Sequence, residues 1–197
     1  MCDLRPGHRR ATSGFTLIEL MVTIVVLSIL LALAVPAFRT FMQNDQQWVQ
    51  QNGLVLSLNQ ARSEAIKNDM TGGVQMCSSS DGATCTGTPW NQGWIVLPSV
   101  NPFNPAAAPK PLQVVGALPT GTTLTEANGN LTVTFQSNGA LNLGLLAAPG
   151  ALPPVAFRMC DIRGATQARY LQVSPMGRVA ASQTPGQDLT GGALVCP

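Results

Sequence analysis

One long apolar segment near the N-terminus limits what this protein can become. Residues 20–37 carry no charged side chain, and the segment extends back to Phe15 with Glu19 as its only charge. As a helix rising ~1.5 Å per residue, residues 15–35 are long enough to cross the ~30 Å hydrocarbon layer of a membrane. The segment is therefore a membrane anchor or an export signal.

The residues leave three interpretations of this segment open. Ala32-Leu33-Ala34 resembles the small-residue cleavage site of a secretory signal, and a plain signal anchor is the second interpretation. The third depends on the run Gly14-Phe15-Thr16-Leu17-Ile18-Glu19-Leu20, which follows a basic leader. This run resembles the prepilin peptidase recognition sequence of type IV pilins and of the pseudopilins of type II secretion.

The prepilin resemblance implies roles for Gly14, Phe15 and Glu19. It implies a cut between Gly14 and Phe15, methylation of the new Phe15 amine, and an apolar helix that stays as anchor and assembly element. A carboxylate inside an apolar helix costs roughly 2.5 to 3.5 kcal/mol on insertion scales, so Glu19 needs a compensating partner. In a pilin, Glu19 would pair with the N-terminal ammonium of a neighbouring subunit. An ordinary signal sequence gives this carboxylate no purpose, so we favour the prepilin interpretation.

An amphipathic segment follows the membrane stretch. Pro36 predicts a kink in the helix. Beyond it, apolar residues recur at intervals near three and four, namely Phe38, Phe41, Met42, Trp48, Val49, Val55 and Leu58. This spacing predicts a helix that continues to about Lys67, where Gly72-Gly73 follows, and that packs its apolar stripe on the rest of the protein.

The remainder of the sequence is expected to be mostly antiparallel sheet. Turn-forming clusters such as Asn128-Gly129-Asn130 separate short strand-like runs, which are residues 74–77, 93–97, 131–136, 155–159 and 169–173. Residues 98–119 are rich in Pro and Ala and nearly uncharged, which predicts a long connection or exposed loop. Trp90 and Trp94 are expected to fill core positions rather than to form a ligand platform.

The cysteines predict disulfides. Cys2 lies in the leader, and the remaining four are Cys77, Cys85, Cys160 and Cys196. An even number outside the membrane favours disulfides, and four cysteines allow three connectivities. We favour Cys77 with Cys85 and Cys160 with Cys196, the latter closing a loop of about 37 residues that would contribute roughly 3 to 4 kcal/mol. A zinc site is disfavoured because no C-x2-C pair is present.

The composition removes several classes of function. The only histidine is His8, so the protein that remains after cleavage at Gly14 has no imidazole for proton transfer or metal binding. We therefore expect no cofactor, no metal and no enzyme, although a secreted enzyme released at Ala34 is an alternative. From Phe15 onward, eight basic and eight acidic residues balance, which gives no general electrostatic case for nucleic acid.

Beyond the anchor, the sequence resembles the GspH/FimT family of minor pilins and pseudopilins. The resemblance rests on four segments in order: Ala61-Arg62-Ser63-Glu64-Ala65, Cys77 through Cys85, Trp90 with Gly93-Trp94-Ile95-Val96, and Ser174-Pro175-Met176-Gly177-Arg178-Val179. It implies an α+β fold in which a long N-terminal helix packs on a C-terminal antiparallel β-sandwich-like domain. The implied parts are a leader (1–14), a transmembrane and assembly helix (15–37), its amphipathic continuation (38–70) and a β-rich domain (71–197).

The resemblance also implies a structural role. The protein would be a minor pilin at or near the tip of a type IV pilus, processed by prepilin peptidase in the inner membrane with its C-terminal domain in the periplasm. Its partners would be other minor pilins or pseudopilins and the major pilin. A minor pseudopilin of type II secretion and a DNA-binding pilin for DNA uptake are the alternatives.

The DNA-binding alternative depends on arginines near the C-terminus. That branch of the family resembles this sequence at Gly177-Arg178, where a Gly-Arg-any-Arg pattern would supply two cations for phosphates. Here the second cation is replaced by Ala180. Arg163, Arg169 and Arg178 remain candidates for a small basic face, and the simpler interpretation is that they are separate solvated arginines.

Overall fold

The computed structural model describes residues 14–67, 73–98, 109–142 and 155–196. Most of the expected leader, the helix-breaking Gly72 and part of the loop expected at residues 98–119 lie outside the described residues. The protein divides into two compact units, Met1–Asp45 and Gln46–Pro197. Helix α1 (Leu17–Lys67) contributes to both units, which are described separately below.

In the first unit, α1 begins with a side-chain cap. The backbone N–H of Glu19 donates to Thr16 Oγ1 (3.3 Å), which satisfies one of the free donors of the first turn. Residues 17–42 are all exposed. The hydroxyl groups of Thr23 and Ser28 donate to backbone carbonyls three residues earlier, so neither hydroxyl is left without an acceptor. By length and composition the helix is able to cross a membrane.

In the second unit, α1 buries one stripe of side chains. The buried positions recur every three or four residues, as an amphipathic helix requires, and they are Gln47, Gln51, Leu54, Ser57, Leu58, Ala61 and Ala65. The helix runs through Pro36 and ends at Lys67, which is the end expected from the sequence.

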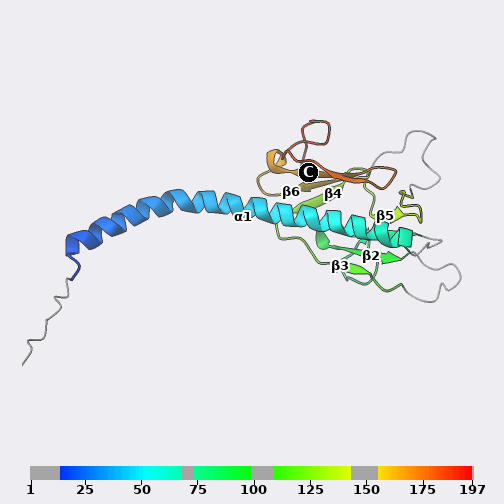
Figure 1. Cartoon of the computed structure of the whole chain (residues 1–197), viewed down its shortest axis with the longest axis horizontal. Helices are drawn as coiled ribbons and strands as arrows, with labels where there is room; N and C mark the ends of the chain where they lie inside the picture. The colour runs from blue at the N-terminus through cyan, green and yellow to red at the C-terminus, as the bar shows by residue number, and fades with distance from the viewer. Residues whose placement is uncertain (1–13, 68–72, 99–108, 143–154, 197) are drawn as a thin grey trace, which may run out of the picture. The chain divides into compact units, whose positions relative to one another are not determined.

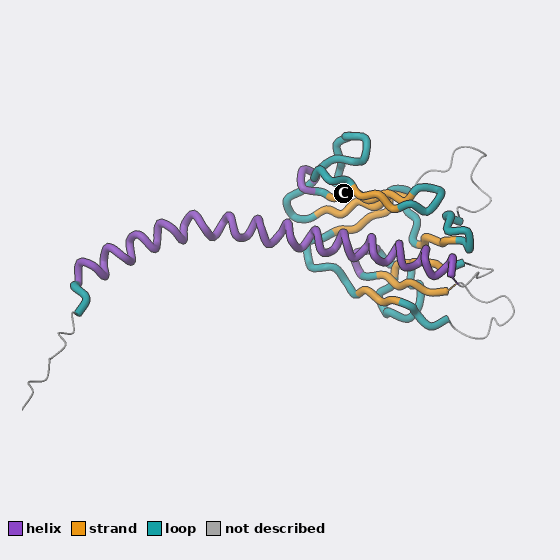
Figure 2. Tube along the Cα trace, viewed as in Figure 1, coloured by secondary structure: helices purple, strands orange, loops and turns teal. Residues whose placement is uncertain are grey.

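Two four-stranded antiparallel sheets make up the rest of the second unit (Figures 1 and 2). The first, sheet A, has the order β3-β2-β1-β5 and comprises β1 (Val74–Ser78), β2 (Trp94–Pro98), β3 (Gln113–Val115) and β5 (Thr132–Phe135). The second, sheet B, has the order β4-β6-β7-β8 and comprises β4 (Thr123–Glu126), β6 (Val155–Cys160), β7 (Arg169–Val173) and β8 (Val179–Ala181). The short 3-10 helices η1 (Trp90–Gln92) and η2 (Ala165–Gln167) precede β2 and β7.

The core joins α1 to both sheets. Leu54, Leu58, Ala61 and Ala65 belong to one buried cluster with side chains of β1, β2 and β5 from sheet A and of β4, β6 and β7 from sheet B. The sheets also meet at η1, where the rings of Trp90 and Phe157 pack edge to face with centroids 5.0 Å apart.

Both tryptophans of this region are core residues, as expected from the sequence. Trp90 and Trp94 are 2% and 1% exposed. The indole N–H of Trp94 donates to Ser57 Oγ on α1 (2.9 Å), and Trp90 donates to the carbonyl of Asn130 (2.9 Å). Each ring therefore buries its apolar body and still satisfies its donor.

The loop expected at residues 98–119 contains a short strand. β3 pairs with β2 over residues 113–115, so this part of the loop prediction is wrong. Its three residues are too few to show an alternating pattern, and pairing with the buried strand β2 supplies the order that the local sequence does not specify.

A buried carboxylate organises the turn that leads from sheet B to sheet A. Glu126, at the end of β4, is 6% exposed. Its carboxylate accepts backbone N–H groups of Asn128 (2.9 Å), Asn130 (2.7 Å) and Ala156 (3.2 Å). The first two donors lie in the turn between β4 and β5, and the third lies near the start of β6, the strand that pairs with β4. One side chain thus fixes the crossover between the two sheets.

Two disulfides close loops on the second unit. The bond between Cys77, in β1, and Cys85 joins residues eight positions apart, and the bond between Cys160 and Cys196 ties the C-terminal tail to β6. Arg158 Nη1 donates a hydrogen bond to the carbonyl of Val195 (3.0 Å), which attaches the tail to the same strand a second time.

Replacing the Glu126 carboxylate by an amide is expected to destabilise the domain. In Glu126→Gln, one acceptor oxygen becomes a donor that faces backbone N–H groups, and leaving buried donors unsatisfied costs roughly 1 to 3 kcal/mol. Denaturant unfolding of the full-length protein in detergent micelles measures this loss. Asp45→Asn, at an exposed acid, is the control and should change stability by less than ~0.5 kcal/mol. Equal effects of the two variants would contradict the assigned role.

Candidate functional site

The N-terminal segment of the first unit places the predicted processing residues at the free start of α1. Gly14 and Phe15 precede the helix and are exposed, with 79% of Phe15 accessible. Glu19 lies in the first helical turn and forms no ion pair with any residue that the structure describes. The Glu19 side chain is exposed.

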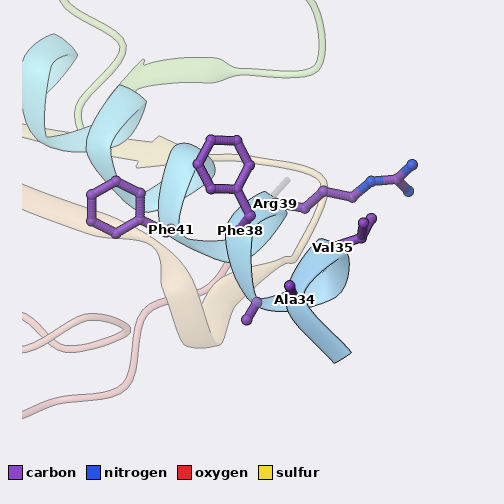
Figure 3. A pocket seen from close by; sticks show the side chains of 6 residues that line it. Ala34, Val35, Phe38, Arg39 and Phe41 are labelled. Carbon is purple, nitrogen blue, oxygen red and sulfur yellow. The ribbon is translucent and has the colours of Figure 1, made fainter. Parts of the chain in front are cut away.

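A shallow groove lies along α1 at the C-terminal end of the apolar stretch. Figure 3 shows Phe38 and Phe41 projecting from the helix, with the Arg39 side chain extending away from the Phe41 ring. The groove is lined by Ala34, Val35, Ala37, Phe38, Arg39 and Phe41.

At the other end of α1, Arg62 connects the turns of both sheets. Its Nε donates to the carbonyl of Gly139 (3.1 Å), which follows β5, and its Nη2 donates to the carbonyl of Met176 (3.2 Å), between β7 and β8. Gly139 and Gly177 both have positive φ, at 78° and 72°. A Cβ on Gly177 would collide with the Gly139 carbonyl. The two turns therefore approach closely because both are glycine turns, and Arg62 joins them.

The three candidate DNA-binding arginines have different surroundings. Arg163 forms an ion pair with Asp161 (2.7 Å), Arg169 is only 7% exposed, and Arg178 is exposed. Arg169 begins β7 and Arg178 lies beyond its other end, so at ~3.3 Å per residue they are separated by the length of the strand. The structure therefore brings Arg163 and Arg169 together but not Arg178.

Arg169 was expected as a surface cation but is largely enclosed. Burial, and then the nearby charge of Arg163, lower the pKa of the Arg169 guanidinium below its ordinary value. The guanidinium lies over the Trp48 ring of α1, with Cζ 5.8 Å from the ring centroid. Sequence reasoning missed this pair, because a tryptophan at position 48 and an arginine at 169 carry no local signal of contact.

Within the residues that the structure describes, no group of three or more His, Cys, Asp or Glu side chains is arranged to hold a metal ion. Asp81 and Asp188 instead organise loops. Hydrogen bonds, foremost from the Thr84 hydroxyl to Asp81 and from the Thr190 hydroxyl to Asp188, hold the pKa of each carboxyl below its ordinary value. Both carboxylates therefore stabilise turns rather than form a charged site.

Comparison with known families agrees with this geometry. A model described as type II transport protein GspH matches residues 50–177, which is more than half of the chain. A prokaryotic N-terminal methylation motif matches residues 9–35. The protein belongs to the GspH family and carries the N-terminal methylation motif of pilin-like proteins.

Two crystal structures of the type IV minor pilin FimU from Pseudomonas aeruginosa are similar, each with 22% sequence identity. One covers 66% of this chain and 88% of its own with a TM-score of 0.47. The other covers 70% of this chain and 98% of its own with a TM-score of 0.44. No curated protein matches this sequence.

Removing the Arg62 guanidinium is expected to loosen both turns. In Arg62→Met, two carbonyls lose a charged donor, which should lower the free energy of unfolding by roughly 1 to 3 kcal/mol. Lys67→Met is the matched control on the same helix end, because its ion pair with Glu64 is exposed and worth at most about 1 kcal/mol. Urea unfolding of the full-length protein in micelles compares the two. An Arg62 variant no less stable than the control would refute the connection.

Proposed function

We propose that this protein is a minor pilin-like structural subunit of a type IV pilus. Prepilin peptidase cuts it after Gly14, Phe15 is methylated, and the subunit is assembled at or near the filament tip. The observation that carries the proposal is the methylation motif over residues 9–35, joined to a GspH-family domain over residues 50–177. An exposed cleavage site followed by a capped apolar helix supports the same conclusion.

Before assembly, the subunit resides in the inner membrane with α1 as a single-pass anchor and the C-terminal domain in the periplasm. Two disulfides in that domain support an oxidising compartment. Its partners are the peptidase, other minor pilins or pseudopilins, and the major pilin. Glu19 offsets its cost in the membrane by pairing with the N-terminal amine of a neighbouring subunit.

A minor pseudopilin of a type II secretion system is the second candidate, favoured by the description of the matching family as a type II transport protein. A DNA-binding pilin has less support, because Arg163 is paired with Asp161 and the exposed Arg178 lies beyond the far end of β7. Salt-sensitive retardation of DNA by the full-length protein in micelles, weakened in Arg178→Gln, would establish DNA binding.

Deletion of the gene tests which machine the subunit serves. If it is a minor pilin, the major pilin should disappear from the sheared surface fraction, and complementation should restore it. Unchanged piliation together with loss of a type II secreted protein from the medium would move the subunit to the pseudopilus. Loss of neither would overturn the proposal of a filament subunit in these machines, unless DNA uptake fails in the same strain.

Substituting Glu19 separates processing from assembly. Glu19→Ala should remain in the membrane, because insertion becomes easier by roughly 2.5 to 3.5 kcal/mol. It should still be cut after Gly14, because the substitution leaves Gly14 and Phe15 unchanged. Its recovery with filaments should fall at least about tenfold, which corresponds to roughly 1.4 kcal/mol of lost pairing. Ser28→Ala, which removes a hydroxyl bound to the Val25 carbonyl of the same helix, is the control. Normal recovery of Glu19→Ala with filaments would exclude the charge pairing.

A further inference from the structure

Polar side chains occupy core positions at one end of the second unit. On α1, Gln47 and Gln51 precede Leu54 in the buried stripe. On β7, Arg169 shares its face of sheet B with Leu171 and Val173, because side chains alternate along a strand. Leu171 and Val173 belong to the main core cluster. The alternation along β7 therefore predicts an apolar residue at position 169, but the residue there is an arginine.

These polar groups are incompletely compensated within the subunit. Arg169 Nε and both amide atoms of Gln47 are enclosed without a hydrogen-bond partner among the described residues, and Gln47 is 2% exposed. Gln51, in contrast, donates to the carbonyl of Tyr170 (3.4 Å). No carboxylate in the described part of the protein forms an ion pair with Arg169. Desolvation penalises an enclosed cation that has no counter-ion, so a free subunit carries this cost.

Trp48 connects this enclosed cluster to the surface. Its ring lies against the Arg169 guanidinium and is 52% exposed. A guanidinium that lies over an aromatic face keeps its N–H donors free for a planar, bidentate acceptor. Arginine and tryptophan are also among the residue types that dominate binding energy at protein interfaces.

We propose that Arg169, Trp48 and Gln47 form a binding site for one carboxylate of a neighbouring filament subunit. This inference rests on the proposed function, because it needs a neighbour in an assembly. Arg169 binds the carboxylate through its fork, Gln47 turns its amide N–H groups to the same acceptor, and Trp48 packs against the incoming subunit. The attraction develops where water is excluded, so it is stronger than a surface ion pair.

The surroundings favour a carboxylate over a nucleic-acid phosphate. Binding along a phosphate backbone needs several cations in a row. The neighbouring cation, Arg163, is already paired with Asp161 at 2.7 Å. A single, largely enclosed guanidinium beside the Trp48 indole fits one planar anion. A Glu or Asp residue or the C-terminal carboxylate of a neighbouring subunit supplies such an anion.

Exchange of Arg169 for an apolar residue of similar length tests the site. Arg169→Met removes an uncompensated buried charge, so the unassembled protein in micelles should unfold at the same temperature as wild type or at a higher one. Its recovery in the filament fraction should nevertheless fall at least about tenfold, equal to roughly 1.4 kcal/mol. Lys110→Met removes the same charge from an exposed position and should change neither quantity.

The outcomes separate the two proposals. If the wild-type protein is never recovered with filaments, the proposed function fails and this inference fails with it. If wild type is recovered and Arg169→Met is recovered equally well, only the carboxylate site is refuted. A lower unfolding temperature of Arg169→Met would also refute it, since Arg169 would then stabilise its own fold. If Arg169→Met assembled normally but no longer retarded DNA in a gel, the site would bind phosphate and not a carboxylate.

Carbodiimide coupling tests the chemistry of the acceptor directly. Arginine does not couple, but in Arg169→Lys the introduced amine attacks an activated carboxylate, forms an amide bond and releases the urea. Filaments containing this variant should yield a cross-linked peptide that joins position 169 to an acidic residue or C-terminus of another subunit, identified by mass spectrometry. Wild-type filaments, in which the Arg169 guanidinium does not couple, are the control. Coupling only within the same subunit, or none, would refute the proposal.

Discussion

The second unit depends on one helical stripe that both sheets share. Leu54, Leu58, Ala61 and Ala65 lie in a single core cluster with strands of sheet A and sheet B, so neither sheet has a complete apolar core without α1. The small side chains of Ala61 and Ala65, both 0% exposed, let the strands approach the helix closely. Larger residues there would separate the sheets, because a packed core does not absorb added volume without strain.

Polar groups fix what the apolar stripe leaves undetermined. A stripe specifies which face is buried, but it does not set how two sheets are aligned along the helix. Glu126 fixes the crossover from β4 to β5, and Arg62 joins the turn after β5 to the turn between β7 and β8. Because each of these contacts links elements of both sheets, the two charged side chains fix how the sheets are aligned, while the apolar stripe packs them. Two charged residues are enough for this in a protein in which 10% of residues are charged.

Local patterns predicted the elements that carry their own signal. Helix α1 and five strands were expected, and residues 169–173 coincide with β7. β3, β4 and β8 were not expected: each is three or four residues long, without an alternating run of apolar side chains, and is ordered by pairing with β2, β6 or β7. The contacts of Arg62 span 77 and 114 residues of sequence, so nothing local could indicate them. Arg169 was misplaced on the surface because arginine is rarely buried.

Two charged side chains, Glu19 and Arg169, lack an opposite charge to pair with inside the described part of the subunit. Glu19 has no ion-pair partner among the described residues, and Arg169 lies in a core-facing position without one. Apolar substitutions at both positions would suit a free subunit better, since desolvation penalises the enclosed Arg169 and, under the proposed function, penalises Glu19 inside the membrane. A protein retains such residues when the state in which it works compensates them. In a filament subunit that state is the assembly, so uncompensated charge in the free subunit favours incorporation and disfavours remaining alone.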